Sequence, residues 1–363
     1  MVPQKILTPA DDYAQLDDYL STLNASKIML VHGHSMTRLP IGEHLARVSA
    51  RFNIINFTSN PEYRSVQRGV EVFNGEGCNA IIAVGGGSAI DTAKCIKLFS
   101  TMPDGDWITQ PIIANDIPLI VIPTTGGSGS EATQFAVLYR RDQKYSIDHP
   151  SAMPQAVLFD AGTLIDLPDY QKKATLLDAW CHSLESSWSI RSNEVSRRYA
   201  RETIRLLVAN KDQYVEGTTD LQNCTFVMYA ANLAGRAINI SRTTAGHAMS
   251  YRLTKKFGLA HGHAVARCVV ELWKFMFDYA VEHGRKELLS TFDEQAEAMG
   301  CRTTPEAIDT FRRTLRDWHL DEPIDVSNSI EELASSVNLQ RLANNPVALD
   351  GETLRRLYRA IGG

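Results

Sequence analysis

Residues 80–94 decide the fold, and they run Ala80-Ile81-Ile82-Ala83-Val84-Gly85-Gly86-Gly87-Ser88-Ala89-Ile90-Asp91-Thr92-Ala93-Lys94. The apolar run predicts a buried strand, the glycines predict a tight loop, and the remainder predicts the start of a helix. Glycines let backbone approach a pyrophosphate closely, and a helix N-terminus supplies N–H donors and a positive dipole end. The segment lacks the Gly-x-Gly-x-x-Gly fingerprint, so a structural turn is the alternative interpretation.

Strand and helix patterns alternate on both sides of this segment. Strands are predicted at 27–32, 53–57, 80–84 and 118–123, with amphipathic helices at 41–50, 63–76 and 88–99 and an appended hairpin at 135–147. Such alternation favours a mostly parallel sheet with helices on both faces. A second small-residue loop at 123–131 follows a predicted strand and contains Thr124, Thr125 and Ser128. Because ligands collect at the carboxyl ends of parallel strands, this loop is a further candidate for the cofactor, with a flexible linker as the alternative.

The second half of the chain has a different pattern. After Asp166-Leu167-Pro168, strand signals almost vanish, and helical periodicity dominates at 174–188, 196–208, 224–240 and 305–319. The run 226–233 is apolar on nearly all sides and predicts a buried helix. We therefore expect two domains: residues 1–165 as a Rossmann-like α/β dinucleotide-binding domain, and residues 166–363 as an all-α domain that binds metal and substrate.

The composition sets limits on the function. A chain of 363 residues with a net charge of −5 predicts about two globular domains and no electrostatic footprint for nucleic acid or an anionic membrane. Six scattered cysteines without a Cys-x-x-Cys pair suit free thiols in a reducing cytosol, so a cytoplasmic location is expected. Neither a secretory signal nor a membrane span is visible in the pattern.

Four residues form a candidate metal site. Asp178 and His182 lie four positions apart in a predicted helix and therefore share one face, while His247 and His261 follow further on. One carboxylate and three imidazoles suit zinc or ferrous iron and leave a coordination position open. The alternative is that each is a polar residue satisfied by hydrogen bonds. Gly246 and Gly262 adjoin two of the histidines and would allow close packing, whereas His263 would point away from the site.

With these residues in place, the chain resembles the iron-containing (group III) alcohol dehydrogenases from about residue 25 onward. The matching motifs are Gly85-Gly86-Gly87-Ser88-x-x-Asp91-x-x-Lys94, Pro123-Thr124-Thr125-x-Gly127-Ser128-Gly129-Ser130-Glu131, Asp178-Ala179-x-x-His182-x-x-Glu185, and His247-Ala248-Met249-Ser250 with His261-Gly262. The resemblance implies the dehydroquinate synthase-like fold of that family, a cleft between the domains, usually a homodimer, and Asp178, His182, His247 and His261 as ligands of Fe²⁺, with Zn²⁺ or Mn²⁺ as alternatives. Expected cofactor-binding residues are Gly33, Ser35, Gly85, Gly86, Gly87, Ser88, Asp91, Thr124, Thr125, Ser128, Thr133 and Lys144.

Two departures from the family pattern bear on the chemistry. Many members place an acidic residue after the first strand, where this chain has Gly33 followed by Ser35; loss of that carboxylate removes repulsion against a 2′-phosphate, so NADPH is expected, with NADH possible. Tyr251 stands where many relatives carry another histidine. Tyr251, His263 or water is therefore expected to supply the proton, and simple packing of Tyr251 beside the metal is the alternative.

Within the family, residues 185–189, 237–244 and 336–346 resemble the phosphonoacetaldehyde reductases, which form 2-hydroxyethylphosphonate in phosphonate biosynthesis. A small dianionic substrate calls for cationic donors, and Arg242 is the leading candidate, ahead of Arg191, Arg236 and Arg267. Reduction of another small aldehyde such as a sulfo- or hydroxyaldehyde, polyol oxidation, a cyclising synthase that uses NAD transiently, and a non-catalytic nucleotide or metal sensor are the alternatives.

Overall fold

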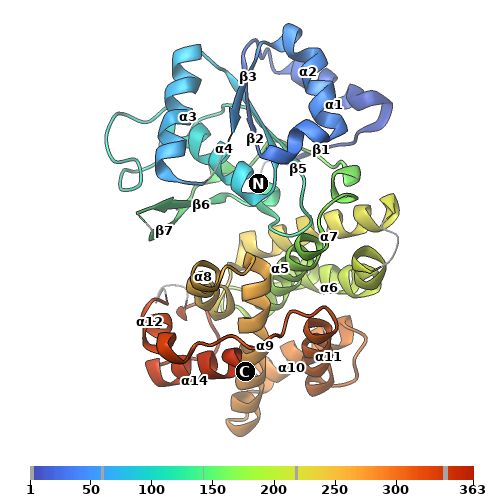
Figure 1. Cartoon of the computed structure of the whole chain (residues 1–363), viewed down its shortest axis with the longest axis vertical. Helices are drawn as coiled ribbons and strands as arrows, with labels where there is room; N and C mark the ends of the chain where they lie inside the picture. Colours follow the sequence, from blue (N-terminus) through green and yellow to red (C-terminus); the bar gives the residue numbers. More distant parts are fainter. Residues whose placement is uncertain (1–3, 59–60, 142, 217–219, 338–341) are drawn as a thin grey trace. The chain divides into compact units, whose positions relative to one another are not determined.

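The computed structural model describes residues 4–58, 61–141, 143–216, 220–337 and 342–363. The chain divides into two compact units, Met1–Asp166 and Leu167–Gly363. The first unit is an α/β fold, and the described residues of the second form helices joined by irregular segments, without strands. The predicted fold class, a parallel-sheet unit followed by an all-α unit, is confirmed (Figure 1).

The first unit contains one parallel sheet of six strands in the order β1-β8-β5-β4-β2-β3. The strands are β1 (Lys5–Leu7), β2 (Ile28–His32), β3 (Ile54–Thr58), β4 (Ala80–Gly85), β5 (Leu119–Pro123) and β8 (Ala156–Leu158). The four strands predicted from the pattern are present. β1 and β8, each of three residues, were not predicted.

Four helices cover the two faces of this sheet, as Figure 1 shows. Residues at alternate strand positions face opposite sides. Met29 and Val31 belong to the apolar cluster that includes α3 (Tyr63–Glu76) and α4 (Gly87–Phe99), whereas Ile28 and Leu30 belong to the cluster with α1 (Ala10–Thr22) and α2 (Pro40–Phe52). This two-sided burial explains why the strands are continuous apolar runs.

Shorter elements complete the unit. The predicted hairpin is present as β6 (Phe135–Arg140) and β7 (Gln143–Asp148), and Asp142 at its tip lies outside the described residues. Single turns of 3₁₀ helix occur at η1 (His34–Arg38), η2 (Ser130–Ala132), η3 (Pro150–Ala152) and η4 (Ala161–Leu164).

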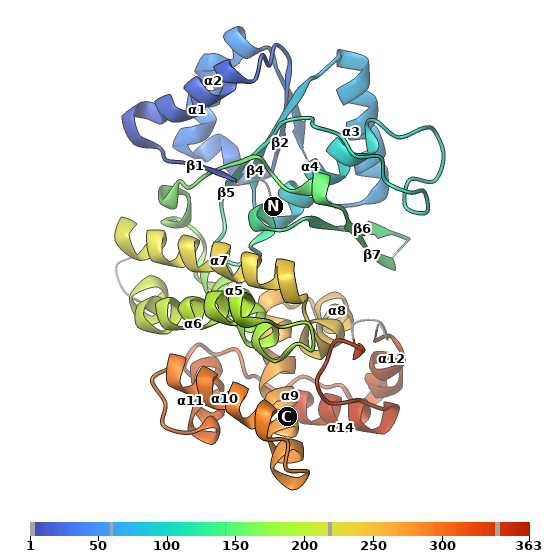
Figure 2. The ribbon, with the colours of Figure 1, turned by 180° about the vertical axis from the view of Figure 1, so that it is seen from behind.

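The second unit is built around α5 (Asp169–Trp188), which packs against α6 (Glu194–Val215), α7 (Leu221–Ser241) and α9 (His261–Glu282) (Figure 2). Its other described helices are α8 (Ala245–Phe257), α10 (Lys286–Ala298), α11 (Thr304–Asp317), α12 (Ile330–Ser335) and α14 (Gly351–Gly362), with a 3₁₀ turn η5 (Ser327–Ser329). Every residue of α5 from Leu176 to Trp188 is buried. None of the helices in the described residues is long and apolar enough to cross a membrane.

One expectation about burial is wrong. The run 226–233 was predicted to be buried on all sides, but it lies in α7, where Tyr229 is 49% exposed. The reason is that α5 and α6 pack against α7 and bury Val227 and Ala230, while Tyr229 lies off that contact. An apolar run therefore indicated the helix but overestimated its burial.

A buried lysine gives the sheet unit a pH-dependent stability. Lys97 in α4 is 1% exposed, and burial lowers the pKa of its ammonium to about 8 from 10.5, although Asp116 opposes this shift. The folded chain therefore binds this proton more weakly than the unfolded chain does. The resulting destabilisation is fully present below about pH 8 and disappears as the pH rises toward 10.5.

We expect Lys97→Met to be more stable than the wild type at pH 7, by about 3 kcal/mol, because methionine fills the site without burying a charge. The difference should shrink between pH 8 and 10.5. Chemical denaturation across this range is the measurement, with Lys286→Met at an exposed lysine as control. A stability difference for Lys97→Met that does not change with pH would contradict the lowered pKa of Lys97.

Candidate metal centre and nucleotide loops

Helix α5 presents three polar side chains on one buried face. Asp178, His182 and Glu185 follow each other at spacings of four and three residues, which places them one turn apart along the same side. All three side chains are buried. Because Trp180 and Leu184 of the same helix are also fully buried, α5 fills the centre of the unit and carries the polar face with it.

Two other helices bring histidines to Asp178. His247 lies in the first turn of α8, and His261 is the first residue of α9. The Oδ1 atom of Asp178 lies 3.4 Å from Nε2 of His247 and 3.8 Å from Nε2 of His261. Ligand atoms of Asp178, His247 and His261 all lie within 4.8 Å of one another. The fold thus brings two histidines to an aspartate that precedes them by 69 and 83 positions in the sequence.

His182 lies at the side of this group. Its Nε2 atom is 3.9 Å from Oδ1 of Asp178, and its ring stacks on that of His247 with centroids 4.5 Å apart. Burial opposes ionisation of Asp178, but the three histidines outweigh it and hold the pKa of the carboxyl well below its usual range. The aspartate is therefore an anion at neutral pH, as a metal ligand must be.

Glu185 holds His247 in place from the side of the ring opposite Asp178. Its carboxylate accepts hydrogen bonds from the backbone and hydroxyl of Thr244, at 2.9 and 2.6 Å, and from the backbone N–H and Nδ1 of His247. Fixing Nδ1 in this way leaves Nε2 directed at Asp178 and increases the basicity of the ring. Its role at His247 was not predicted, although its spacing of three residues from His182 was a usable signal.

The donors present fit a divalent cation. Oδ1 of Asp178 and Nε2 of His247 are buried, and neither has a hydrogen-bond partner among the described residues. Leaving such atoms unsatisfied is costly, and a bound cation would satisfy both. Bonds of about 2.1 Å in a tetrahedral site separate ligand atoms by about 3.4 Å, close to the 3.4–3.9 Å observed around Asp178.

His261 is the most exposed of the four proposed ligands. The side chain of His261 is 39% exposed, whereas those of Asp178, His182 and His247 are exposed by less than 10%. Solvent therefore reaches this group of side chains at His261. Catalytic metal sites keep a position open to substrate whereas structural sites are closed, so the exposure of His261 favours a catalytic site.

Gly262 permits the helices to meet at this point. A Cβ atom at residue 262 would overlap the carbonyl oxygen of Ala174 and lie 2.7 Å from Cβ of Asp178. The backbones of α5 and α9 are therefore in direct contact beside two of the proposed ligands. The predicted close packing at this glycine is confirmed.

The two candidate proton donors have different surroundings. The ring of Tyr251 in α8 stacks on the ring of His261, with centroids 6.0 Å apart and planes at 12°. His263 lies apart from the ligand atoms: Nδ1 is 3.0 Å from the hydroxyl of Tyr170, and Nε2 is 2.7 Å from the carbonyl of Leu320. Burial lowers the pKa of His263.

Of the four candidate arginines, Arg242 has the shortest sequence separation from a proposed ligand, since it precedes His247 by five residues. It ends α7 with φ 64° and ψ 172°, two residues before Thr244. Such a backbone is strained for a residue with a side chain, and strain of this kind clusters at functional sites. Arg267 was also a candidate for binding the anionic substrate, but its guanidinium is buried and donates to the carbonyls of Leu320, Glu322 and Ile361. These backbone contacts give it a structural role.

In the sheet unit, the two glycine-rich loops lie side by side at the carboxyl ends of β4 and β5. The backbone of Thr124 donates to Gly85 at 3.1 Å. A Cβ atom at Gly86 would lie 3.1 Å from Thr125, and one at Gly87 would lie 3.1 Å from Ser128. Gly85 has φ 157°, and its Cβ would lie 2.6 Å from that of Ala89. These loops thus form one surface of small residues at the N-terminus of α4, a suitable cradle for a pyrophosphate.

Two expected cofactor residues lie behind this surface. Oδ1 of Asp91 accepts from the hydroxyl of Ser130 at 2.6 Å, and Oδ2 accepts from the backbone of Val137 at 2.9 Å. Thr133 is buried and contacts Lys94, whose ammonium also donates to Ser130. These contacts tie α4 to the second loop and to β6. They indicate that Asp91 and Thr133 support the loop, while Lys144 is half-buried in β7.

Gly33 and Ser35 lie at the end of β2. The backbone of Gly33 donates to Val84 at 3.2 Å, and Ser35 is exposed in the short η1 helix. The N atom of Gly33 would lie 3.7 Å from a Cβ at Gly85. Gly33 therefore adjoins the first glycine loop directly.

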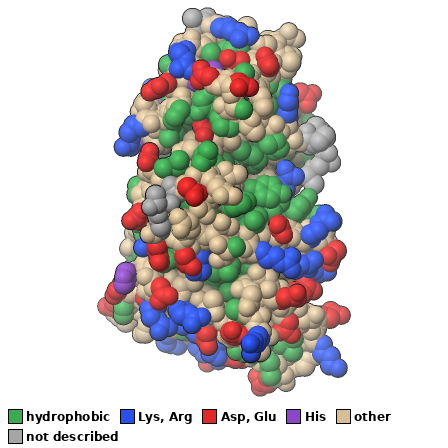
Figure 3. Space-filling model, turned by 90° about the vertical axis from the view of Figure 1, so that its right-hand side faces the viewer, with side chains coloured by type: hydrophobic (Ala, Val, Ile, Leu, Met, Phe, Trp, Pro, Cys, Tyr) green, Lys and Arg blue, Asp and Glu red, His purple; other side chains and the backbone are tan. Residues whose placement is uncertain are grey.

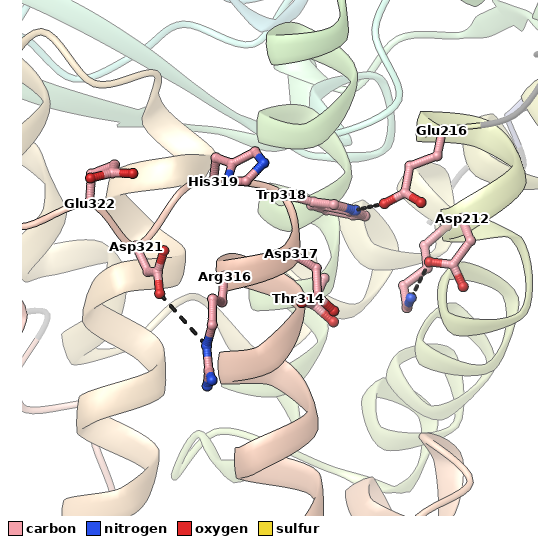
Figure 4. Close-up of a pocket in the computed structure, with 10 residues that line it drawn as sticks. Asp212, Glu216, Thr314, Arg316, Asp317, Trp318, His319, Asp321 and Glu322 are labelled. Carbon is pink, nitrogen blue, oxygen red and sulfur yellow. Dashed lines mark hydrogen bonds and ion pairs between the residues drawn. The ribbon is translucent and has the colours of Figure 1, made fainter.

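A separate cavity of about 820 Å³ in the helical unit contains none of these residues. It lies beside α6 and the end of α11 (Figure 4). Several of its polar groups pair with each other: Trp318 donates to Glu216 at 3.1 Å, and Arg316 lies 4.0 Å from Asp321.

Figure 3 shows acidic and basic side chains interspersed over one face of the molecule.

Comparison with known proteins links this geometry to one family. The family model for iron-containing alcohol dehydrogenase matches residues 3–161, and the model for the C-terminal part of the Fe-containing alcohol dehydrogenase family matches residues 172–362. The phosphonoacetaldehyde reductase of Streptomyces viridochromogenes is 30% identical over 310 residues, which cover 76% of this chain and 74% of that protein.

Solved structures agree on the fold. An iron-containing alcohol dehydrogenase from Thermococcus thioreducens superposes with a TM-score of 0.90 at 22% identity, covering 100% of this chain and 99% of that one. A sulfoacetaldehyde reductase from Bifidobacterium kashiwanohense, in complex with NAD⁺, gives a TM-score of 0.87 at 21% identity, covering 100% and 98%.

Proposed function

The chain belongs to the iron-containing alcohol dehydrogenase family, and within that family we propose that it reduces a small anionic aldehyde, namely phosphonoacetaldehyde to 2-hydroxyethylphosphonate, with NADPH. The family uses NAD(P) and a divalent metal. The observation that carries the proposal is the group formed by Asp178, His247 and His261, which is buried except at His261. The 30% identity to a phosphonoacetaldehyde reductase supports the choice of substrate.

Each part of the proposed site has a chemical task. A divalent cation held by Asp178, His182, His247 and His261 would supply Lewis-acid polarisation of a carbonyl group. A reduced nicotinamide would supply the hydride. Glu185 keeps the ring of His247 oriented. Tyr251 is the proposed proton donor, because its ring stacks on His261, whereas both nitrogens of His263 contact Tyr170 and Leu320.

Arg242 is proposed to recognise the anionic group of the substrate. It stands five residues before His247, and its strained backbone is held where the connection from α7 to α8 begins. That connection is fixed by Asn344, which donates to the carbonyls of Ser241 and Thr243, both at 2.9 Å. An arginine in a connection that is fixed in this way and leads directly to a proposed ligand suits a phosphonate, which accepts paired hydrogen bonds.

We expect Arg242→Met to raise KM for phosphonoacetaldehyde about 100-fold and to leave acetaldehyde reduction nearly unchanged, because only the anionic substrate loses a charge-assisted contact. Steady-state kinetics with both aldehydes are the measurement. Arg205→Met, at an exposed arginine of α6 that is not among the candidates for the substrate, is the control and should resemble the wild type. Equal loss on both substrates would show that Arg242 supports the structure without selecting the anion.

Steady-state kinetics also distinguish phosphonoacetaldehyde from the nearest alternative substrate. A preference for sulfoacetaldehyde over phosphonoacetaldehyde in the wild type would assign the enzyme to a different anionic aldehyde on the same fold. A preference for uncharged aldehydes or polyols would overturn the anionic class. The proposal also includes a homodimer, as the family resemblance implies, and a location in the cytosol, as the scattered free cysteines suggest. Residues 338–341, part of the segment that resembles the phosphonoacetaldehyde reductases, lie outside the described residues.

A further inference from the structure

A pocket of about 580 Å³ lies beside the edge strand β3 in the sheet unit. Its lining comes from the last residues of β3 and the first two turns of α3. The lining residues are Asn56, Phe57, Thr58, Arg64, Ser65 and Arg68. Neither glycine loop contributes to it, so this pocket is distinct from the expected pyrophosphate cradle.

The lining of this pocket favours an anion. Arg64 and Arg68 are four residues apart on α3 and both exposed, and neither forms an ion pair with any described residue. By contrast, Arg47 and Arg140 of the same unit pair with carboxylates. None of the described residues that line the pocket is acidic. Two guanidinium groups without carboxylate partners, one turn apart, match the needs of a phosphomonoester dianion.

Hydrogen-bond donors complete the same surface. Thr58 and Ser65, which carry hydroxyls, and Asn56, which carries an amide, are among the lining residues. Arg64 and Ser65 belong to the first turn of α3, a helix of 14 residues, where the dipole adds positive potential. The pocket therefore offers cationic, hydroxyl and dipolar contacts together, which a surface arginine alone would not.

The register of the sheet places this pocket next to the expected adenosine ribose. His32 pairs with Thr58 on one side and with Val84 on the other, so the ends of β3, β2 and β4 lie at one edge. Neighbouring strands are about 4.8 Å apart. A dinucleotide with its pyrophosphate at Gly85 and its ribose at Gly33 would thus direct a 2′-phosphate toward β3. In doubly wound folds a nearby arginine accommodates that phosphate.

We propose that Arg64 and Arg68 bind the 2′-phosphate of NADPH and thereby set the choice between NADPH and NADH. This inference rests on the proposed use of NADPH. It explains how the chain could favour the phosphorylated cofactor: Gly33 removes a repelling carboxylate, while the arginine pair supplies attraction one strand away.

Binding measurements on the intact protein test the proposal without turnover. The wild type should bind adenosine 2′,5′-bisphosphate more tightly than ADP in calorimetry, and NADPH more tightly than NADH in fluorescence titration. In the double variant R64Q/R68Q, affinity for NADPH and for the bisphosphate should fall about 100-fold, while affinity for NADH should change less than about threefold. The control R51Q alters an exposed arginine of α2 and should bind all four ligands as the wild type does.

The possible failures can be told apart. If the wild type prefers NADPH and R64Q/R68Q keeps that preference, the pocket is not the phosphate site, although the proposed cofactor stands. If the wild type binds NADH and ADP at least as tightly as their 2′-phosphorylated counterparts, both the NADPH assignment and this inference are overturned. Neither result depends on the identity of the aldehyde, because no substrate is present.

Discussion

Alanine in place of His261 is expected to lower kcat/KM for aldehyde reduction by about 10³-fold or more, and to leave the purified protein with far less divalent metal than the wild type. His261 contributes one of three ligand atoms that lie within 4.8 Å of one another. Lewis-acid stabilisation is worth several kcal/mol, and each 1.36 kcal/mol corresponds to a factor of ten in rate. Metal analysis and steady-state kinetics on the same preparation are the measurements.

The exposure of His261 makes this variant informative. Since its side chain is 39% exposed, its loss should leave the core and the circular dichroism spectrum intact. His283→Ala provides a control at an exposed histidine directly after the same helix, and it should retain metal and activity. A His261→Ala protein with normal activity and little metal would remove the cation from the mechanism; one with normal metal and no activity would assign His261 a role other than ligation.

The strands that could be predicted each have five or six residues, of which three or more are apolar. β2, β4 and β5 are buried on both faces, and this leaves a pattern in the sequence. β1 has only three residues and an exposed start, and its partner β8 lies about 150 positions away. Three residues are too few to show a period, and pairing at such a separation depends on tertiary packing. The strand order could not be predicted for the same reason.

For the candidate metal centre, too, the sequence predicts some features and not others. The spacing of Asp178 and His182 predicts a shared helix face, because helical geometry is local. The approach of His247 and His261 to that face depends on how α8 and α9 pack, which the residues themselves do not specify. Glu185 was overlooked as a support for His247 because buried carboxylates are recognised by their partners, and those partners lie 59 and 62 positions away. Arg267 was misjudged because backbone carbonyls, its actual partners, leave no mark in a sequence.

Alanine in place of Gly262 is expected to cost about 3 kcal/mol of stability and to prevent metal retention, although the change adds a single methyl group to the helical unit. That methyl group would overlap the backbone carbonyl of Ala174, and backbone cannot rotate away as a side chain can. Relief requires α9 to move away from α5. His261, the neighbouring residue, would then move away from Asp178, so that stability and metal content should fall together.

Gly351→Ala separates this effect from the general consequence of adding a methyl group to a helix. At Gly351 in α14 the nearest atom to a new Cβ is the flexible end of Arg355, 3.5 Å away, so stability should change by less than about 0.5 kcal/mol and metal content should not change. Denaturation curves and metal analysis of both variants are the measurements. If Gly262→Ala were as stable and as rich in metal as the wild type, α5 and α9 could not be in backbone contact beside Asp178. The short ligand distances that depend on this contact would then have to arise from another arrangement of the helices. A Gly262→Ala protein that is destabilised but still binds metal would instead show that the ligands hold their positions independently of this contact.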